Sequence, residues 1–235
     1  MSTQVASEQI PDTRPLYRSM VIVDLQGSTQ RNNPNKGEAR RTLYTLLEQA
    51  LRGTGITPRH RERLVDRGDG VLVLVKPHDD VPKTVLIGVL IPELAALLDD
   101  HNATVAESAL RLRLRAVVHA GEVHEDKNGF YGDDLDFACR LLDSPKLKQA
   151  LKEAAASPLV LAVSEEIYQG IVQQGYLDEA LYRPLCRVRV GNRLRRGWLH
   201  IPASALPHHP VMVPLPRGEL PSASLTASPW ATMTA

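Results

Sequence analysis

The first hydrophobic segments of the chain predict a strand followed by a helix. Residues 20–23 form a continuous apolar run that ends at Asp24, which is typical of a strand buried on both faces. A polar, turn-rich stretch follows. Residues 38–52 then place alanine and leucine at helical spacing, and Gly53 and Gly55 come directly after them. Glycines at this position commonly end a helix, so the pattern predicts strand, loop and helix in that order.

Two further apolar runs predict a hairpin. Residues 63–65 and 71–75 are strand-like, and the glycine-rich segment 66–70 between them is a turn signal. This arrangement places Asp69 at the tip of the hairpin. A helix is then expected over residues 83–101.

The second half of the chain continues the alternation of strands and helices. Residues 110–118 alternate apolar side chains with arginine, as expected of a strand with one buried face. The remaining expected elements are a helix over 134–151, a strand over 159–163, a short helix capped by Ser164 and a closing hairpin formed by 188–190 and 198–201. This order predicts an α+β fold in which helices cover one side of a mainly antiparallel sheet.

The two ends of the chain differ from the part between them. Residues 1–16 are polar with two prolines, and residues 204–235 carry six prolines among serine, threonine and alanine. Such composition favours poor order. Residues 17–203 contain no low-complexity linker and no internal repeat, so we expect a single domain there.

Charge and aromatic content favour a small ligand over a nucleic acid. Lysine and arginine total 28 against 27 acidic residues, so the net charge of +1 supplies no bulk field for a phosphate backbone or an anionic membrane. Two Trp, six Tyr and two Phe are few for a platform that stacks the bases of a single strand. Any recognition of phosphate must therefore be local.

The cysteines and the apolar segments indicate the cellular compartment of the protein. Cys139 and Cys186 lie far apart in sequence, which indicates neither a zinc site nor a disulfide framework. The first residues lack the pattern of a secretory signal. The longest apolar stretch, residues 85–91, is interrupted by Pro92 and Glu93 well short of the roughly 20 residues that cross a bilayer. We therefore expect a cytoplasmic protein without a membrane anchor.

Two carboxylates stand out by their positions. Asp24 ends the first strand, and Asp69 lies in the turn of the neighbouring hairpin. If the strand pairs with the hairpin, both side chains meet at one edge of the sheet. Divalent cations that accompany nucleoside triphosphates use a few carboxylates together with phosphate oxygens. The alternative is that both aspartates simply form turns.

Two other segments carry possible chemistry. Gly27, Ser28 and Thr29 follow Asp24 directly, and a turn of small residues exposes backbone N–H groups that cradle phosphate oxygens. Further along, Asp136 and Arg140 stand four residues apart on one expected helix face. Taken alone, this spacing is that of an ordinary surface ion pair.

Together these pieces resemble the class III nucleotidyl cyclase domain. The matching segments are the first metal motif over 21–29, the hairpin motif over 68–72, the strand and turn over 113–123, and the Gly-x-x-x-Asn-x-Ala-x-Arg-Leu helix pattern over 132–142. The resemblance covers residues 17–202 in the family's order and at its spacing.

The resemblance implies a ferredoxin-like core that forms a head-to-tail homodimer with active sites across the interface. Asp24 and Asp69 would hold two Mg²⁺ or Mn²⁺ ions, with the backbone carbonyl of Leu25 as an additional ligand. Arg140 of the partner subunit would neutralise charge that grows on the α-phosphate.

Three positions depart from the family pattern. Val65 stands where purine-specific cyclases carry a base-reading lysine, and Gly129 stands where adenylate cyclases carry an aspartate. Asp136 replaces the transition-state asparagine, and a carboxylate cannot donate a hydrogen bond as an amide does. A cyclase-like domain that binds a nucleotide or a partner protein without turnover therefore remains an alternative, as does a purine cyclase.

The missing purine readers, together with Tyr44 in the first helix, resemble the bacterial pyrimidine cyclases of the Pycsar antiphage systems. This resemblance implies conversion of UTP, or CTP, to cyclic UMP or CMP, a messenger read by a separate effector protein. Tyr44 and Tyr131 would contact the base, and Arg40 would lie near the phosphates. The alternative for Tyr44 is a ring that packs against the sheet. A uridylate cyclase without a nucleic-acid or membrane partner is the leading hypothesis.

Overall fold

The computed structural model describes residues 14–202, so the expectations for the two ends lie almost entirely outside the described residues. The strands are β1 (Leu16–Leu25), β2 (Val65–Asp66), β3 (Gly70–Val75), β4 (Leu114–Asp126), β5 (Gly129–Tyr131), β6 (Leu159–Ser164), β7 (Tyr182–Val190) and β8 (Arg193–His200). The α-helices are α1 (Asn33–Gly53), α2 (Lys83–Val85), α3 (Ile91–Thr104), α4 (Asp133–Leu142), α5 (Pro145–Glu153) and α6 (Glu165–Ile167). Short 3₁₀ or π segments are η1 (Ser28–Gln30), η2 (Pro58–His60), η3 (Leu86–Leu90), η4 (Ser108–Leu110), η5 (Tyr168–Val172) and η6 (Glu179–Leu181).

The strands form one mixed sheet. Its order is β2-β3-β1-β4-β6-β8-β7, with β5 paired to β4 outside this path. Only β4 and β6 pair in parallel, and every other pair in the described chain is antiparallel. The α+β fold and the mainly antiparallel sheet are therefore confirmed, and β1 lies between β3 and β4 as the site hypothesis requires.

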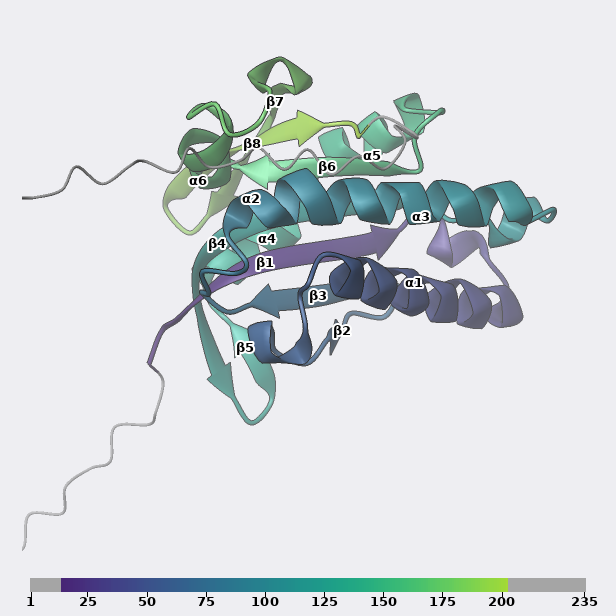
Figure 1. Ribbon diagram of the computed structural model, residues 1–235, viewed down its shortest axis with the longest axis horizontal. Helices are drawn as coiled ribbons and strands as arrows, with labels where there is room; N and C mark the ends of the chain where they lie inside the picture. The colour runs from purple at the N-terminus through teal and green to yellow at the C-terminus, as the bar shows by residue number, and fades with distance from the viewer. Residues whose placement is uncertain (1–13, 203–235) are drawn as a thin grey trace, which may run out of the picture.

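Helices cover both faces of the sheet, so the prediction of helices on one side was wrong. One core joins α1, η3 and α3 to alternate strand residues such as Val21 and Val23. A second core, on the other face of the sheet, joins α4 and α5 to the intervening strand residues, such as Met20 and Ile22. Figure 1 shows α1 and α3 in front of the sheet and α4 behind it. The continuous apolar runs of the central strands are apolar on both faces, so both faces need cover.

The helix expected over 134–151 is interrupted. α4 ends at Leu142, and α5 begins at Pro145. Ser144 caps α5, and its Oγ accepts a hydrogen bond from Leu147 N at 3.3 Å. A proline has no N–H for the helical ladder and disfavours helical geometry in the residue before it, so the chain turns here and starts a new helix.

Strand boundaries also differ from the expectation. The strand placed at 110–118 begins only at Leu114 and extends to Asp126, because residues 108–110 form a 3₁₀ turn. Its far half pairs with β5, a strand that the sequence pattern did not indicate. The closing hairpin is longer than expected and runs from Tyr182 to His200.

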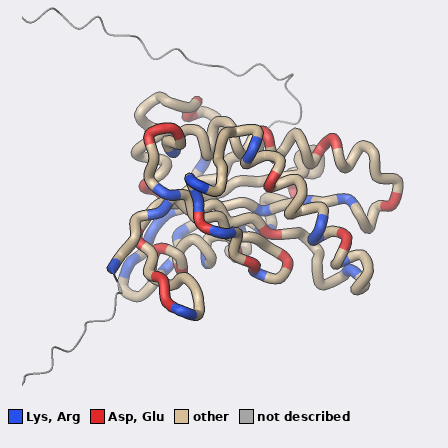
Figure 2. Tube along the Cα trace, turned by 60° about the horizontal axis from the view of Figure 1, so that its bottom comes forward, with Lys and Arg blue, Asp and Glu red and all other residues tan. Residues whose placement is uncertain are grey.

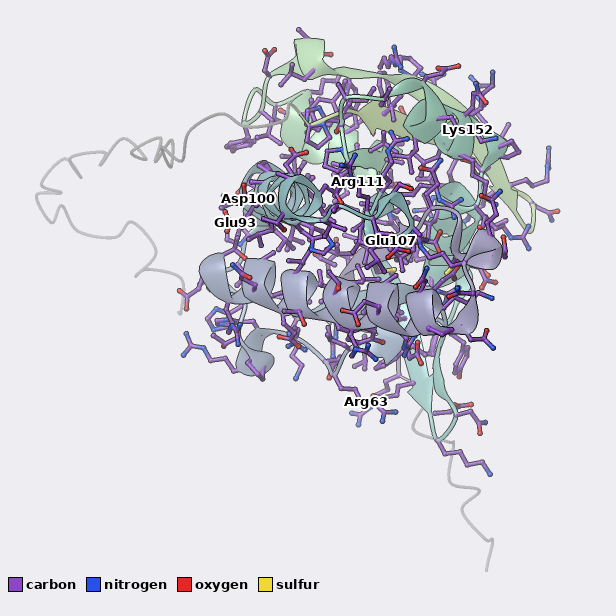
Figure 3. All side chains as sticks on the ribbon, turned by 90° about the vertical axis from the view of Figure 1, so that its right-hand side faces the viewer. Arg63, Glu93, Asp100, Glu107, Arg111 and Lys152 are labelled. Carbon is purple, nitrogen blue, oxygen red and sulfur yellow. The ribbon has the colours of Figure 1, made fainter. Side chains whose placement is uncertain are left out.

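Helices α1 and α3 cross on the front face. In Figure 3, α3 is seen end-on with Glu93 and Asp100 labelled, and α1 lies across the view beside it. Lys152 marks α5, which belongs to the opposite face. Within the described residues, no helix has both the length and the apolarity needed to cross a bilayer.

Candidate functional site

Asp24 and Asp69 meet at one end of the sheet. Asp24 is paired with Gly70 in the β1–β3 ladder, and Leu25 N donates to Asp69 O at 3.0 Å. A side chain at position 70 would place its Cβ 2.5 Å from Val23 O, so only glycine lets β3 start this close to β1. The carboxylates are near enough to interact directly. Burial raises the pKa of Asp24 to about 6, and the neighbouring Asp69 adds to that rise.

Arg115 faces the same carboxylate. It is the cross-strand neighbour of Asp24 in the β1–β4 ladder, and its Nη2 donates to Asp24 Oδ2. The residue is only 9% exposed, and within the described chain its Nε and Nη1 have no hydrogen-bond partner. The pairing opposes the rise in the pKa of Asp24. Arg115 was not among the predicted site residues, because its position opposite Asp24 depends on the register of two strands that lie far apart in sequence.

The loop after β1 completes this end of the sheet. Gly27 has φ of +70°, a conformation that favours glycine, and it precedes the 3₁₀ turn η1. Ser28 Oγ donates to Asp69 Oδ2. Arg31 holds the loop in place, since its guanidinium donates to the carbonyls of Gln26, Ala109 and Arg111 at 2.8, 3.1 and 3.0 Å. The small residues therefore lie against the aspartates on a fixed loop.

A cavity of about 380 Å³ opens over these groups. Its lining includes the predicted residues Asp24, Leu25, Gly27, Ser28, Thr29 and Asp69. It also includes Arg67, Arg115 and Lys148, three cations that the sequence analysis did not select. Lys148 lies on α5 and pairs with Asp143 at 3.3 Å. With Asp143, the lining holds three carboxylates and three basic side chains, a mixture that suits a cation together with a polyanion.

A second cavity of about 300 Å³ adjoins the first. The two share Leu25, Ser28, Thr29 and Asp69, and the second adds the basic side chains of Arg31, Lys36 and Arg40. Positive charge is therefore concentrated around the aspartates, although Figure 2 shows both signs of charge interspersed over the rest of the chain.

Arg40 and Tyr44 form a small cluster beside the second cavity. The Arg40 guanidinium lies 5.1 Å from the centroid of the Tyr44 ring and donates to Asp66 Oδ1 at 2.6 Å. Arg40 lines the cavity, whereas Tyr44 does not. The Tyr44 ring is partly buried against the core of α1 and α3. This position agrees with the packing alternative and leaves the hydroxyl beside the guanidinium, with Arg40 Nη2 3.4 Å away.

The predicted residues of α4 do not join the aspartates within one chain. Asp136 and Arg140 are exposed, neither lines the two cavities, and Arg140 Nη1 donates to Arg189 O at 3.0 Å. The i,i+4 ion pair between them is not formed among the described residues. Tyr131 is 43% exposed on β5 and stacks on His124 with the ring centroids 5.3 Å apart. Within the described chain these three residues therefore lie away from both cavities.

A buried polar network anchors the start of α4. His119 of β4 is fully buried, with Nδ1 2.8 Å from Ser164 Oγ and Nε2 3.4 Å from Asp134 Oδ1. Arg195 of β8 donates to Asp134 at 2.6 Å and to Glu166 at 2.8 Å. The network therefore joins three strands, β4, β6 and β8, and the short helix α6 to the helix that carries Asp136 and Arg140.

The charge of Asp134 is strongly favoured in this network. Burial tends to raise its pKa, but hydrogen bonds from the histidine, the arginine and the Glu122 amide outweigh burial and hold the pKa well below 3.8. Gly121 makes the contact possible, since a Cβ at that position would overlap the Asp134 carboxylate. The guanidinium of Arg195 also lies 4.3 Å from the centroid of the Phe137 ring. The first turn of α4 is thus held by contacts of Asp134 with His119, Arg195 and the Glu122 amide.

Comparison with known proteins identifies the fold. No protein-family model and no curated protein matches the chain. Among solved structures, an adenylate/guanylate cyclase/hydrolase from Silicibacter pomeroyi is 17% identical with a TM-score of 0.56, and covers 81% of this chain and 99% of its own. The catalytic core of a rhodopsin-guanylyl cyclase with converted specificity, in complex with ATPαS, is 13% identical with a TM-score of 0.55. That match covers 82% of this chain and 98% of the cyclase core. The adenylyl cyclase CyaB from P. aeruginosa is 13% identical with a TM-score of 0.55, and the match covers 82% of this chain and 97% of CyaB.

The chain has the class III nucleotidyl cyclase fold. These neighbours are named as adenylyl or guanylyl cyclases, and their names do not indicate a pyrimidine substrate. Identities this low describe the architecture.

The aspartate pair fits divalent metal ions. Asp24 and Asp69 provide hard oxygen ligands in direct proximity, and the pKa of Asp24 is raised first by burial and then by the neighbouring Asp69, so a bound cation would favour its ionised form. Leu25 lines the same cavity. The donor set is what Mg²⁺ or Mn²⁺ takes when substrate phosphates fill the remaining positions.

Proposed function

We propose that this protein is a metal-dependent nucleotidyl cyclase that works as a homodimer and takes a pyrimidine nucleoside triphosphate, with UTP preferred over CTP. The observation that carries the proposal is the meeting of Asp24 and Asp69 beside a cavity with basic walls in a class III cyclase fold. The products are a 3′,5′-cyclic nucleotide and pyrophosphate.

Asp24, Asp69 and the Leu25 carbonyl would hold two Mg²⁺ or Mn²⁺ ions. When bound, such ions lower the pKa of the ribose 3′-hydroxyl and stabilise the departing pyrophosphate. In the reaction the 3′-oxygen forms a bond to the α-phosphorus, the bond from that phosphorus to the bridging oxygen breaks, and the hydroxyl proton passes to water.

The chain's own residues supply the remaining stabilisation. Arg67, Arg115 and Lys148 line the cavity and balance the charge of the triphosphate, and the N–H groups of residues 27–29 face the phosphate oxygens. Arg140 of the partner subunit approaches the α-phosphate, where negative charge grows during the reaction. The exposure of Arg140 on its own subunit supports this division of roles.

Two positions support a pyrimidine base. Val65 is apolar, is paired with Leu72 in the β2–β3 ladder and packs at the edge of the second core. Gly129 offers no side chain at all. Neither side chain can therefore make the hydrogen bond with which purine-specific cyclases read the base, and this absence is the basis for proposing a pyrimidine. Arg40 and Tyr44 beside the second cavity are the proposed contacts to the nucleotide.

The product would act as a messenger for a separate effector protein in antiviral defence. This part of the proposal rests on the resemblance to the Pycsar pyrimidine cyclases alone. Detection of an effector that binds the purified cyclic nucleotide would support it.

The substrate test uses purified protein with Mn²⁺ and each of the four ribonucleoside triphosphates, followed by chromatographic separation of the products. Cyclic UMP or CMP should dominate, and cyclic AMP or GMP as the main product would reject pyrimidine selectivity. Asp69→Asn should abolish turnover and leave the dimer intact. The matched control is Asp100→Asn on the exposed part of α3, which should retain activity.

A second candidate function is nucleotide binding without turnover. The exposed Asp136 favours it, because a carboxylate stands where the cyclase pattern has an amide donor. In this case UTP with Mn²⁺ raises the melting temperature and releases no pyrophosphate. Asp136→Asn separates the two functions: a large gain in cyclisation indicates a decayed enzyme, and a loss indicates that the aspartate suits this substrate.

A further inference from the structure

We infer that His60, His78 and Asp80 form a binding site for one divalent transition-metal ion of the Zn²⁺, Co²⁺ or Ni²⁺ class. One ligand atom from each residue lies within 4.8 Å of the other two. Two imidazoles and a carboxylate are a recurring donor set for these ions, with water in the open positions. None of the three residues lines either cavity at the aspartate pair.

His60 is prepared for this role by its surroundings. The residue is 2% exposed, its Nδ1 lies 3.0 Å from Gly55 O, and Arg59 Nε donates to its Nε2 at 2.8 Å. Both contacts are shorter than the 3.2 Å contact from Thr57 N to Nδ1. Because the arginine N–H can only donate, Nε2 has to accept, and the proton of the neutral ring is then assigned to Nδ1, toward the Gly55 carbonyl. A backbone carbonyl that fixes the tautomer in this way is the usual support of a metal-binding histidine.

His78 and Asp80 supply the exposed half of the site. Their side chains are 45% and 60% exposed, and His78 Nδ1 lies 3.5 Å from Asp80 Oδ2. The rings of His60 and His78 have centroids 4.9 Å apart. Metal–nitrogen bonds are about 2.0–2.1 Å long, so small rotations of the two exposed side chains bring all three atoms onto one ion.

The Arg59 guanidinium already occupies the cluster as a cation. The Arg59 guanidinium contacts His60 Nε2 at 2.8 Å and Asp80 Oδ2 at 3.2 Å, so it bridges two of the three ligands. The Arg59 side chain is 70% exposed and is free to swing into solvent. A metal ion therefore has to displace it, which predicts that removal of the guanidinium strengthens metal binding.

The site lies at the base of the hairpin that carries Asp69. Lys76 N donates to His60 O at 2.8 Å, and Arg61 forms an isolated bridge with Val75. An ion between His60 and His78 ties the two ends of this hairpin together. The six residues of β3 keep it roughly 17 Å from the aspartates. An ion that binds only the folded state stabilises the protein by RT ln(1 + c/Kd) at ion concentration c, so the stabilisation grows with the logarithm of that concentration.

The test is a Co²⁺ titration of metal-stripped full-length protein, followed by visible absorbance, with Zn²⁺ as competitor. The background protein carries His208→Ala and His209→Ala, which removes adjacent histidines outside the described residues, and Asp69→Asn, which impairs the proposed catalytic site. One saturable equivalent with d–d bands and a raised melting temperature is expected. Its appearance in the Asp69→Asn background makes the result independent of the proposed cyclase activity.

Variants then assign the ligands. His78→Ala should lower Co²⁺ affinity by at least about 10-fold, and Arg59→Gln should raise it. Asp79→Asn is the matched control, since this exposed neighbour lies between two ligands and should bind as the background protein does. The inference is overturned if the background protein shows no saturable binding, or if His78→Ala binds Co²⁺ as well as Asp79→Asn does.

Discussion

Arg115 lies directly across the β1–β4 ladder from Asp24, and its guanidinium donates to the carboxylate that we propose as a metal ligand. Two other nitrogens of Arg115 are buried, and no described residue accepts a hydrogen bond from them. The arginine lowers the pKa of Asp24, whereas burial and Asp69 raise it. Arg115 therefore helps to keep the proposed metal ligand Asp24 ionised in a place where burial disfavours its charge.

Replacement of Arg115 by methionine should weaken metal binding. Without the guanidinium the pKa of Asp24 rises further, so protons compete more strongly with the ion. For a rise of about one unit above the present pKa of about 6, we expect the Mn²⁺ concentration for half-maximal activity to increase about 2-fold at pH 7 and about 10-fold at pH 5. Arg111→Met, on an exposed loop labelled in Figure 3, is the control. An unchanged Mn²⁺ requirement in Arg115→Met contradicts the assigned role.

Metal affinity should also depend on pH around 6. The pKa of Asp24 is raised to about 6, so its carboxylate is ionised above that pH and protonated below it. Apparent Mn²⁺ affinity should therefore fall as the pH is lowered from 7 to 5, by about 10-fold per unit once the pH is below 6. Isothermal titration calorimetry across this range measures the effect. A flat profile would show that Asp24 is not a ligand.

The anchor of α4 should contribute to stability in a pH-dependent manner. The folded state depresses the pKa of Asp134, so its contribution is present above 3.8 and is lost as the pH falls below that value. Asp134→Asn should therefore lower the free energy of unfolding by about 2 kcal/mol at pH 7, and by progressively less below pH 3.8. Urea unfolding at several pH values is the measurement. Asp133→Asn on the exposed side of the same turn should change little at any pH.

Gly121 should not tolerate a side chain, because its Cβ would overlap the Asp134 carboxylate. Gly121→Ala should destabilise the fold by about 1–3 kcal/mol and reduce activity through α4. Gly170→Ala is the matched control, since nothing lies within 4 Å of its Cβ and the residue is helical. There the substitution should be neutral or stabilising by up to about 1 kcal/mol. Equal effects of the two substitutions would argue against the overlap.

Local sequence signals located much of the candidate site. The apolar run before Asp24 and the glycine turn around Asp69 correctly predicted a strand and a hairpin that place both carboxylates together. The position of each carboxylate at the end of its strand follows from the residues next to it in the sequence. The break before α5 was also readable from Pro145, although the expected helix ran across it.

The cations around the aspartates were beyond sequence reasoning. Arg115 reaches Asp24 through the register of two strands, and Lys148 reaches the cavity only because α5 packs on the second face of the sheet. That face was not expected to carry helices. An arginine in an alternating strand has the same local pattern whether its guanidinium meets solvent or a buried aspartate. Such contacts depend on tertiary packing, which a single sequence does not specify.

The proposed dimer makes a prediction that separates the roles of two residues. If Asp69 acts on its own subunit and Arg140 acts on the partner's site, each single variant abolishes both sites of its homodimer. A mixed dimer of Asp69→Asn with Arg140→Ala, however, concentrates both lesions in one site and leaves the other intact. Random pairing of equal amounts makes half of the dimers mixed, so about a quarter of wild-type activity should return.

Co-expression of the two variants with different affinity tags allows the mixed dimer to be isolated and assayed. A second mixture, of Asp69→Asn with Asp24→Asn, is the control, because both lesions then act from the same side of the interface and each site of the mixed dimer carries one of them. That mixture should stay inactive. Recovery in the control, or none in the test mixture, would show that the aspartates and Arg140 do not meet across a subunit interface.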